Sequence, residues 1–317
     1  MPNTILHKRS STATAAATTT GNAMQAAAAA WSGFTGWYSP ADVAAHAALL
    51  SQSSQAAQQA MVGIFSRYVA ELNALLTDAA RIEVPQVRLA PVRNGADPVQ
   101  VHSRPAYVFR ETFAITGDEY AAQERALERA MQLVETDIML ASRQVEHDSM
   151  DALGITTYRR VLRPELSESG PCGLCVVAAN RIYTIKALLP IHGRCKCRTV
   201  PIVGDIDPGI TLNRDDLDRL YEAAGSTDRR DLKRIRVQVN EHGELGPVLS
   251  VRGQKFTGPD DLAAGIAATD EENRRRIDQL NLILSDFKRR DRAGDDLTAP
   301  IAYQKRLIEN VTSLLNG

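Results

Sequence analysis

All four cysteines of this 317-residue chain lie in one short segment, between Cys172 and Cys197. A chain of this length buries enough apolar surface to fold without disulfide support. A secreted disulfide framework would also spread its cysteine pairs along a shorter chain. The clustering therefore indicates a local role for the cysteines, and it favours a reducing compartment such as a bacterial cytoplasm.

The spacing of these cysteines is typical of a zinc site. The segment reads C-x2-C, then sixteen residues, then H-x2-C-x-C. Thiolate and imidazole are ligands that suit Zn²⁺, which usually takes four of them in a tetrahedron. The preferred shell is Cys172, Cys175, His192 and Cys195, with Cys197 as the alternate ligand and an all-cysteine shell as the close second. Five available ligands favour a closed structural site over a catalytic site with an open position.

Three roles without a metal stay open for the cysteines. Reduced cysteines can pack as small apolar side chains, and two pairs can form disulfides after release into an oxidising medium. A Cys–His catalytic dyad is chemically reasonable, but no third residue that would orient it stands out. Crowded thiols beside a histidine favour metal binding over each of these.

Composition excludes several classes of protein. The charges nearly balance, with 37 Lys and Arg against 38 Asp and Glu, so no global field attracts nucleic acid or an anionic membrane. Aromatic residues make up only 5% while alanine is abundant, which favours helices over a β-sandwich or barrel. No apolar run approaches the ~20 residues of a membrane helix, and we expect no membrane contact.

The order of patterns along the chain predicts an α+β fold that is mostly helical, with a small zinc-knuckle-like module and a β-hairpin between helical flanks. We expect four consecutive segments. They are a flexible Ala/Ser/Thr-rich arm at 1–38, a helical region at 39–153, a module with the Cys/His cluster and the hairpin at 154–258, and C-terminal helices at 259–317.

Local signals place the elements within these segments. Ser39 and Pro40 are suited to start one long helix or two in series, and a proline-rich patch at 84–105 ends it. A second helix is predicted at 118–153, followed by a strand after Gly154. The runs "RIRVQV" and "VLSVRG" predict a hairpin across the loop "NEHGELGP", and the last fifty residues predict two helices separated at 293–300.

Two helical stripes are predicted to be packing faces. They are Leu127, Met131, Val134, Ile138, Ala141 and Val145, and Ile277, Leu280, Leu284 and Phe287. The sequence "EHDS" at 146–149 holds the residue types of a hydrolytic triad, but consecutive helical residues point in different directions. We interpret it as a solvated helix face.

The stretch "CGLCVVAANRIYTIKALLPIHGRCKCRTVPI" resembles the signature of the MuF-like family of tailed-phage minor head proteins, named for protein F of phage Mu. The block "NEHGELGPVLSVRGQKFTGPDDL" is similar to the versions found in phages of actinobacteria, and the lead-in "YRRVLRPELSESGPCGLC" is similar too. Together these blocks run from Tyr158 to about Leu262. The combination of C-x2-C, L-P-x-H-x2-C-x-C and G-x2-G-P-V-L is specific, whereas each fragment alone is weak.

The resemblance implies a virion protein in the capsid interior near the portal, made in the host cytoplasm, that assists head assembly and genome packaging or exit. It implies the portal protein and the major capsid protein as partners, and it carries a zinc-like ligand set onto the five residues of the Cys/His cluster. It transfers no catalytic residue, so the sequence leaves enzymatic activity undecided, with a non-enzymatic role favoured.

Two alternative functions remain open. Relatives of this kind include capsid maturation proteases, although the chain has no G-x-S-x-G or H-E-x-x-H motif. A nucleic-acid-binding zinc module is the second alternative, since Arg194, Lys196 and Arg198 alternate beside the cysteines and can meet phosphates. The absence of interleaved aromatic residues favours incidental contact with packaged DNA over specific recognition.

Overall fold

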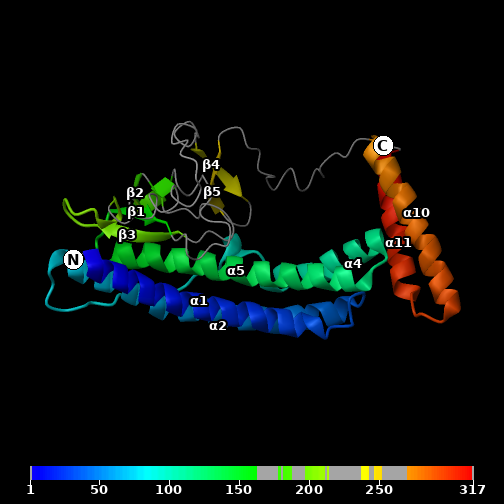
Figure 1. Ribbon diagram of the computed structural model, residues 1–317, viewed down its shortest axis with the longest axis horizontal. Helices are drawn as coiled ribbons and strands as arrows, with labels where there is room; N and C mark the ends of the chain where they lie inside the picture. Colours follow the sequence, from blue (N-terminus) through cyan, green and yellow to red (C-terminus); the bar gives the residue numbers. More distant parts are fainter. Residues whose placement is uncertain are drawn as a thin grey trace. The chain divides into compact units, whose positions relative to one another are not determined.

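The computed structural model describes residues 2–162, 178–179, 181–187, 197–210, 213, 237–242, 246–251 and 270–315 (Figure 1). The chain forms two compact units. Unit 1 consists of Met1–Asn22, Ser54–Gly95 and Glu135–Gly258, and unit 2 consists of Ala23–Ser53, Ala96–Val134 and Pro259–Gly317. Each unit is built from segments distant in sequence, whereas the sequence indicates four consecutive segments.

Three long helices account for most of the N-terminal half: α1 (Pro2–Ser32), α2 (Pro40–Thr77) and α5 (Glu119–Ala152). Helix α2 is one continuous helix, and it begins where the sequence predicts. The hydroxyl of Ser39 accepts a hydrogen bond from the backbone N–H of Asp42 at 3.3 Å, so Ser39 acts as the N-cap. Helix α5 confirms the predicted second helix, and most of its predicted stripe is buried, from Val134 to Val145.

The N-terminal segment differs from the expected flexible arm, because it forms α1 instead. Alanine has the highest helix propensity, and the hydroxyls of Thr19 and Thr20 donate to the carbonyl oxygens four residues earlier. Side chains at helical spacing are also buried, namely Ala13, Ala16, Ala27 and Trp31. Tertiary packing therefore stabilises a sequence whose polar residues suggest a tail.

The proline-rich patch contains two further helices that the sequence patterns do not predict. After the 3-10 turn η1 (Arg93–Gly95) come α3 (Pro98–His102) and α4 (Arg104–Thr116). A side-chain oxygen of Asp97 accepts from the N–H of Val99 at 2.8 Å, so α3 is capped. Helix α4 ends at Gly117, whose φ of 69° lies in the left-handed region that glycine adopts without strain.

Unit 1 contains a three-stranded antiparallel sheet with β1 (Thr157–Val161) between β2 (Ile182–Thr184) and β3 (Arg198–Ile202). The predicted strand after Gly154 is therefore confirmed as β1. In the ladder, Arg160 is paired with Thr199 and Val161 with Arg198. On the other side, Tyr158 is paired with Tyr183. Strands β2 and β3 thus run parallel to each other on either side of β1.

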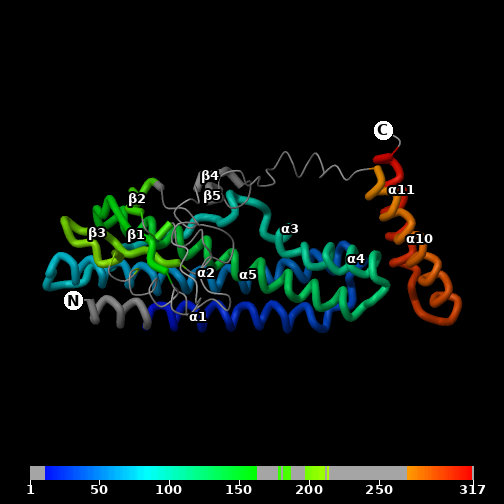
Figure 2. Tube along the Cα trace, turned by 45° about the horizontal axis from the view of Figure 1, so that its top comes forward, coloured from blue at the N-terminus to red at the C-terminus, as the bar shows by residue number. Residues whose placement is uncertain are grey.

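The predicted β-hairpin is confirmed by β4 (Val237–His242) and β5 (Gly246–Val251), which pair in an antiparallel ladder. The ladder runs through residues that the sequence assigns to the loop, because Asn240 is paired with Val248 and His242 with Gly246. The connection is therefore shorter than expected. Figure 1 shows β4 and β5 beside each other, and Figure 2 traces the three strands β1, β2 and β3.

Unit 2 contains the two predicted C-terminal helices, α10 (Asp270–Ala293) and α11 (Thr298–Leu315), packed against α4. Ala114, Leu280 and Val311, one residue from each helix, form their buried core. The amide nitrogen of Gln304 donates to the carbonyl oxygens of Ala114 at 2.8 Å and of Leu280 at 2.9 Å, which joins the three helices. The predicted stripe on α10 is buried at Leu280, Leu284 and Phe287.

None of the helices that the structure describes has the length and apolar character needed to cross a membrane.

Candidate functional site

Of the five predicted metal ligands, the structure describes Cys197. The other four, Cys172, Cys175, His192 and Cys195, lie outside the described residues. Cys197 immediately precedes β3, and this buried cysteine is only 2% exposed. The sequence makes Cys197 the alternate ligand, and the structure places it directly before a strand in the interior of unit 1.

Side chains from two helices fix the edge of β3. The guanidinium of Arg143, on α5, donates to the carbonyl oxygen of Cys197. The hydroxyl of Tyr68, on α2, donates to the carbonyl oxygen of Thr199 at 3.2 Å. Edge strands present unpaired backbone groups, and these contacts satisfy two of them. They also hold the backbone of Cys197 in one position.

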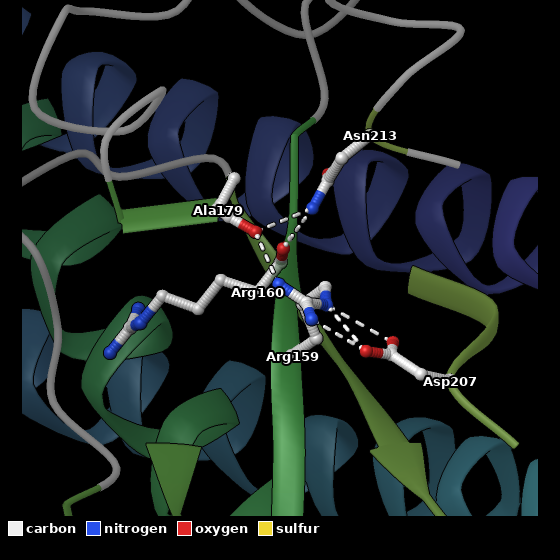
Figure 3. Close-up of polar contacts among 5 residues, drawn as sticks. All are labelled: Arg159, Arg160, Ala179, Asp207 and Asn213. Carbon is white, nitrogen blue, oxygen red and sulfur yellow. Dashed lines mark hydrogen bonds and ion pairs between the residues drawn. The ribbon is translucent and has the colours of Figure 1, made fainter. Parts of the chain in front are cut away.

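The parts of the chain adjacent to both cysteine pairs meet at one end of the sheet (Figure 3). The side-chain amide of Asn213 donates to the carbonyl oxygens of Arg160 and Ala179, each at 2.8 Å, and its oxygen accepts from the N–H of Leu162 at 3.1 Å. Ala179, four residues after Cys175, is thereby tied to the C-terminal end of β1. The pairing of Val161 with Arg198 puts Cys197 at this same end.

One face of the sheet carries a cluster of two tyrosines and an arginine, in which Tyr158 and Arg160 are buried and Tyr183 is partly exposed. Tyr158 and Tyr183 stack with ring centroids 5.4 Å apart, and the Arg160 guanidinium lies 5.4 Å from the Tyr183 ring centroid. The Tyr183 hydroxyl donates to the carbonyl oxygen of Ala178 at 2.9 Å. Burial raises the pKa of Tyr183, and the Arg160 charge opposes that rise.

The guanidinium of Arg160 is the least compensated charge in this cluster. Its residue is 1% exposed, and neither Nε nor Nη1 has a hydrogen-bond partner in the part of the chain that the structure describes. Burial raises the pKa of Tyr158, and a hydrogen bond from Arg160 opposes the rise. A buried charge is costly unless an opposite charge or acceptors face it.

The neighbouring buried arginines each have a carboxylate. Arg159 points away from Arg160 and pairs with Asp207, with its Nη2 at 2.6 Å and its Nε at 2.8 Å from Oδ2 (Figure 3). The Nη1 of Arg143 donates to Oε2 of Glu146 at 2.9 Å, and that same oxygen accepts from the hydroxyl of Thr199 at 2.9 Å. These pairs satisfy the rule that buried charges are matched.

The interpretation of "EHDS" as a solvated helix face is wrong for two of its four residues. Glu146 and Ser149 are fully buried, and the hydroxyl of Ser149 donates to that of Ser66 at 3.2 Å, which joins α5 to α2. His147 and Asp148 are more exposed and contact each other at 2.7 Å. As expected from helical geometry, the four side chains do not converge on one site.

The structure also bears on the alternating basic residues beside the cysteines. The guanidinium of Arg198 lies 4.6 Å from the centroid of the Phe65 ring on α2, and its Nε and Nη1 are shielded from solvent. Arg198 is therefore turned inward, away from any phosphate that approaches the surface. Arg194 and Lys196 lie outside the described residues.

Two buried arginines lie near Cys197 in the described part of the chain. Among the described residues, no group of three or more His, Cys, Asp and Glu side chains is arranged to hold a metal ion. Thiolates bound to zinc are negatively charged, and nearby guanidinium groups favour the thiolate over the thiol. Arg143, which donates to the carbonyl oxygen of Cys197, is itself paired with Glu146, and Arg160 lies on the strand next to β3.

Asn213 and Arg160 are the important residues that sequence reasoning missed. Asn213 lies in a segment rich in Asp and Arg, and its sequence context does not indicate that its side chain is buried and hydrogen-bonded. Arg160 carries a weak signal, since it is a charged residue at an inward position of an alternating strand. Comparison of the chain with protein families, with curated proteins and with solved structures finds no match.

Proposed function

We propose that this chain is a minor head protein of a tailed bacteriophage, placed in the capsid interior near the portal. Its role there is non-enzymatic, and it assists head assembly and the packaging or exit of the genome. The support is the resemblance of the segment from Tyr158 to about Leu262 to MuF-like proteins.

The structural observation that supports the proposal is that described residues next to the cysteine pairs lie at one end of the three-stranded sheet. Leu162 and Ala179 are joined through Asn213, and Cys197 begins the adjacent strand. In this proposal the two cysteine pairs bind one ion. A structural zinc held by four of the residues Cys172, Cys175, His192, Cys195 and Cys197 would lock the connections between β1, β2 and β3 together.

The proposed partners are the portal protein and the major capsid protein. A protein that is assembled into a particle needs rigid surfaces more than a reaction centre, and the described parts of both units offer packed helices for this purpose. Contact with packaged DNA is non-specific in this proposal, because the chain is nearly neutral and Arg198 is turned inward.

Protease protection in assembled heads tests the proposal. The chain is produced together with a portal protein and a major capsid protein that assemble into heads, and the heads are purified and treated with a protease before and after they are opened. We expect the chain to co-purify with heads and to be digested only after opening. Digestion in intact heads, or failure to co-purify, would overturn the assignment.

The same heads test the maturation-protease alternative. We expect the major capsid protein to keep its length when this chain is added with or without a chelator. Cleavage that requires this chain and is lost on alanine replacement of one of its Ser–His pairs would replace the proposed role with the enzymatic one.

A further inference from the structure

The turn between α1 and α2 borders an open hollow of about 370 Å³. This volume lies within the range of roughly 300–1,000 Å³ that is typical of small-ligand sites. All the residues that line the hollow belong to unit 2. They come from the end of α1, from the turn and from the first two turns of α2, and they include Ala30, Gly33, Phe34, Gly36, Asp42 and His46.

Asp42 gives this hollow its negative charge. It is the one acidic residue between Arg9 and Arg67, and that stretch contains no Lys or Arg either. The C-terminal end of α1 and the N-terminal end of α2 carry partial charges of about −0.5 and +0.5, which offset each other. Burial lowers the pKa of His46, so its ring is neutral at neutral pH and does not repel a cation. The hollow therefore favours a positively charged ligand.

Gly36 keeps a space open between the carboxylate of Asp42 and the ring of Phe34. A Cβ atom at Gly36 would lie 3.1 Å from Oδ2 of Asp42 and 3.0 Å from Cζ of Phe34, which is closer than side chains normally approach. The φ angle of Gly36 lies outside the left-handed region, so its backbone does not require glycine. What the missing side chain provides is room beside the carboxylate and the ring.

A carboxylate beside an aromatic ring matches a guanidinium group. Such a group donates to the carboxylate through its N–H groups and lies against the ring through cation–π attraction. The protein uses the ring contact elsewhere, since the guanidinium of Arg110 lies 4.7 Å from the ring centroid of Tyr107. Planar cations are therefore the class of ligand that this hollow fits.

The hollow opens to solvent and continues into an exposed apolar side chain. Asp42 is exposed, and Leu49, seven residues further along α2, is 66% exposed. Residues at i and i+7 lie on one face of a helix, about 10.5 Å apart along its axis. An extended peptide spans that distance in three residues of about 3.3 Å each. A chain whose arginine enters the hollow can therefore place an apolar side chain on Leu49.

We infer that the turn between α1 and α2 is a docking site for a partner protein, which inserts an arginine side chain between Asp42 and Phe34 and places an apolar residue against Leu49. The carboxylate of Asp42 accepts hydrogen bonds from the guanidinium, and the ring of Phe34 packs against it. This site goes beyond the proposed function, because its geometry depends neither on the cysteines nor on zinc.

Tryptophan fluorescence of the unmodified chain measures this binding, because the ring of Trp31 lies 4.9 Å from that of Phe34 and 4.6 Å from that of His46, between centroids. N-acetylarginine amide should bind saturably with a dissociation constant on the order of 1 mM. N-acetylcitrulline amide has nearly the same shape without the charge, and it should bind about 10-fold more weakly. Equal binding of the two compounds, or no saturable binding of the arginine compound, would overturn the inference.

Substitutions test the two sides of the hollow. Asp42→Asn removes the charge and leaves the N-cap residue Ser39 in place, and it should raise the dissociation constant of N-acetylarginine amide about 10-fold. Phe34→Leu should raise it about 3-fold, because it removes the ring. Asp278→Asn is the matched control, since Asp278 is an exposed carboxylate on α10 of the same unit, and it should change nothing. An unchanged constant for Asp42→Asn, with helix content retained by circular dichroism, would contradict the role of Asp42.

A tetrapeptide distinguishes a docking site from a site for a free guanidinium compound. Acetyl-Arg-Gly-Gly-Leu-amide places a leucine three positions after the arginine, and partial burial of that leucine should make it bind about 5-fold more tightly than N-acetylarginine amide. Leu49→Ala should remove this gain and leave the binding of N-acetylarginine amide unchanged. If the tetrapeptide binds no more tightly than the single amino acid, the docking site is overturned and the hollow takes a free guanidinium compound instead.

Discussion

The three-helix core of unit 2 and the sheet of unit 1 are stabilised by opposite kinds of interior. Helices α4, α10 and α11 meet through Ala114, Leu280 and Val311, and the amide nitrogen of Gln304 adds hydrogen bonds to two backbone carbonyl oxygens. The sheet instead meets the helices through charges, with Arg143 and Glu146 buried between them. In an apolar core, the loss of stability grows with the side-chain volume that a substitution removes. In a charged interior, removal of one partner of an ion pair leaves the other charge unmatched and costs more stability.

The largest expected effect is at Glu146. In Glu146→Leu, the buried charge of Arg143 loses the Glu146 carboxylate, and the hydroxyl of Thr199 loses its acceptor. We expect the variant to lose about 3–5 kcal/mol of unfolding free energy in unit 1. Hydrogen exchange of peptides that cover β1 and β3 measures this loss within the unit.

A double variant sharpens this prediction. Arg143→Met combined with Glu146→Leu removes both charges, so it should regain most of the stability lost by Glu146→Leu alone. Glu271→Gln is the surface control, because Glu271 forms an exposed i,i+4 pair with Arg275 and should cause no measurable change. If the double variant is no more stable than the single one, the uncompensated charge is not the cause of the loss.

The next effect in size is at Leu280, which is fully buried among α4, α10 and α11. Leu280→Ala should cost about 2–5 kcal/mol in unit 2, because it removes apolar contacts and leaves a cavity. Leu282→Ala is the matched control two residues away, since Leu282 is 71% exposed. Hydrogen exchange in α10 and α11 should increase for the first variant and stay unchanged for the second.

These two regions also differ in how far the sequence predicts them. The stripe of Leu280, Leu284 and Phe287 has helical spacing, so both the helix and its buried face follow from periodicity. The same reasoning gives α2, α5 and β1. It misses α4, because Pro105 suggests a break although it stands in the first turn of the helix, where proline is tolerated.

The candidate site is harder to predict, because its residues are matched only in three dimensions. Cysteine spacing identifies a cluster of candidate ligands, but it does not reveal the surroundings of Cys197. Those surroundings depend on the ladder that pairs Arg160 with Thr199 and on the hydrogen bonds of Asn213. The sequence pattern assigns Glu146 to solvent for the same reason: a buried ion pair looks like a surface residue until its partner is known.

The smallest expected effect is a pH dependence in unit 2. The ring of His46 lies 4.6 Å from that of Trp31 and 4.7 Å from that of Phe34, between ring centroids. Burial lowers the pKa of His46, and a hydrogen bond to the backbone of Ala30 opposes this. Asp42 is the charged residue that lines the same surface hollow. The Nε2 of His46 has no acceptor in the described part of the chain, so protonation puts a charge where none is satisfied.

The direction of the effect follows from proton linkage. The unfolded chain binds a proton at His46 near the usual pKa of about 6.5, and the folded chain binds it only at lower pH. The stability of unit 2 should therefore fall as the pH drops below about 6.5.

Both tryptophans of the chain, Trp31 and Trp37, lie in this aromatic cluster, so intrinsic fluorescence reports on it directly. Urea midpoints measured by fluorescence should decrease between about pH 7 and about pH 5.5 more for the parent chain than for His46→Phe, because phenylalanine keeps the ring packing without the titrating group. Equal decreases in the urea midpoints of the two proteins would show that a group other than His46 causes the pH dependence.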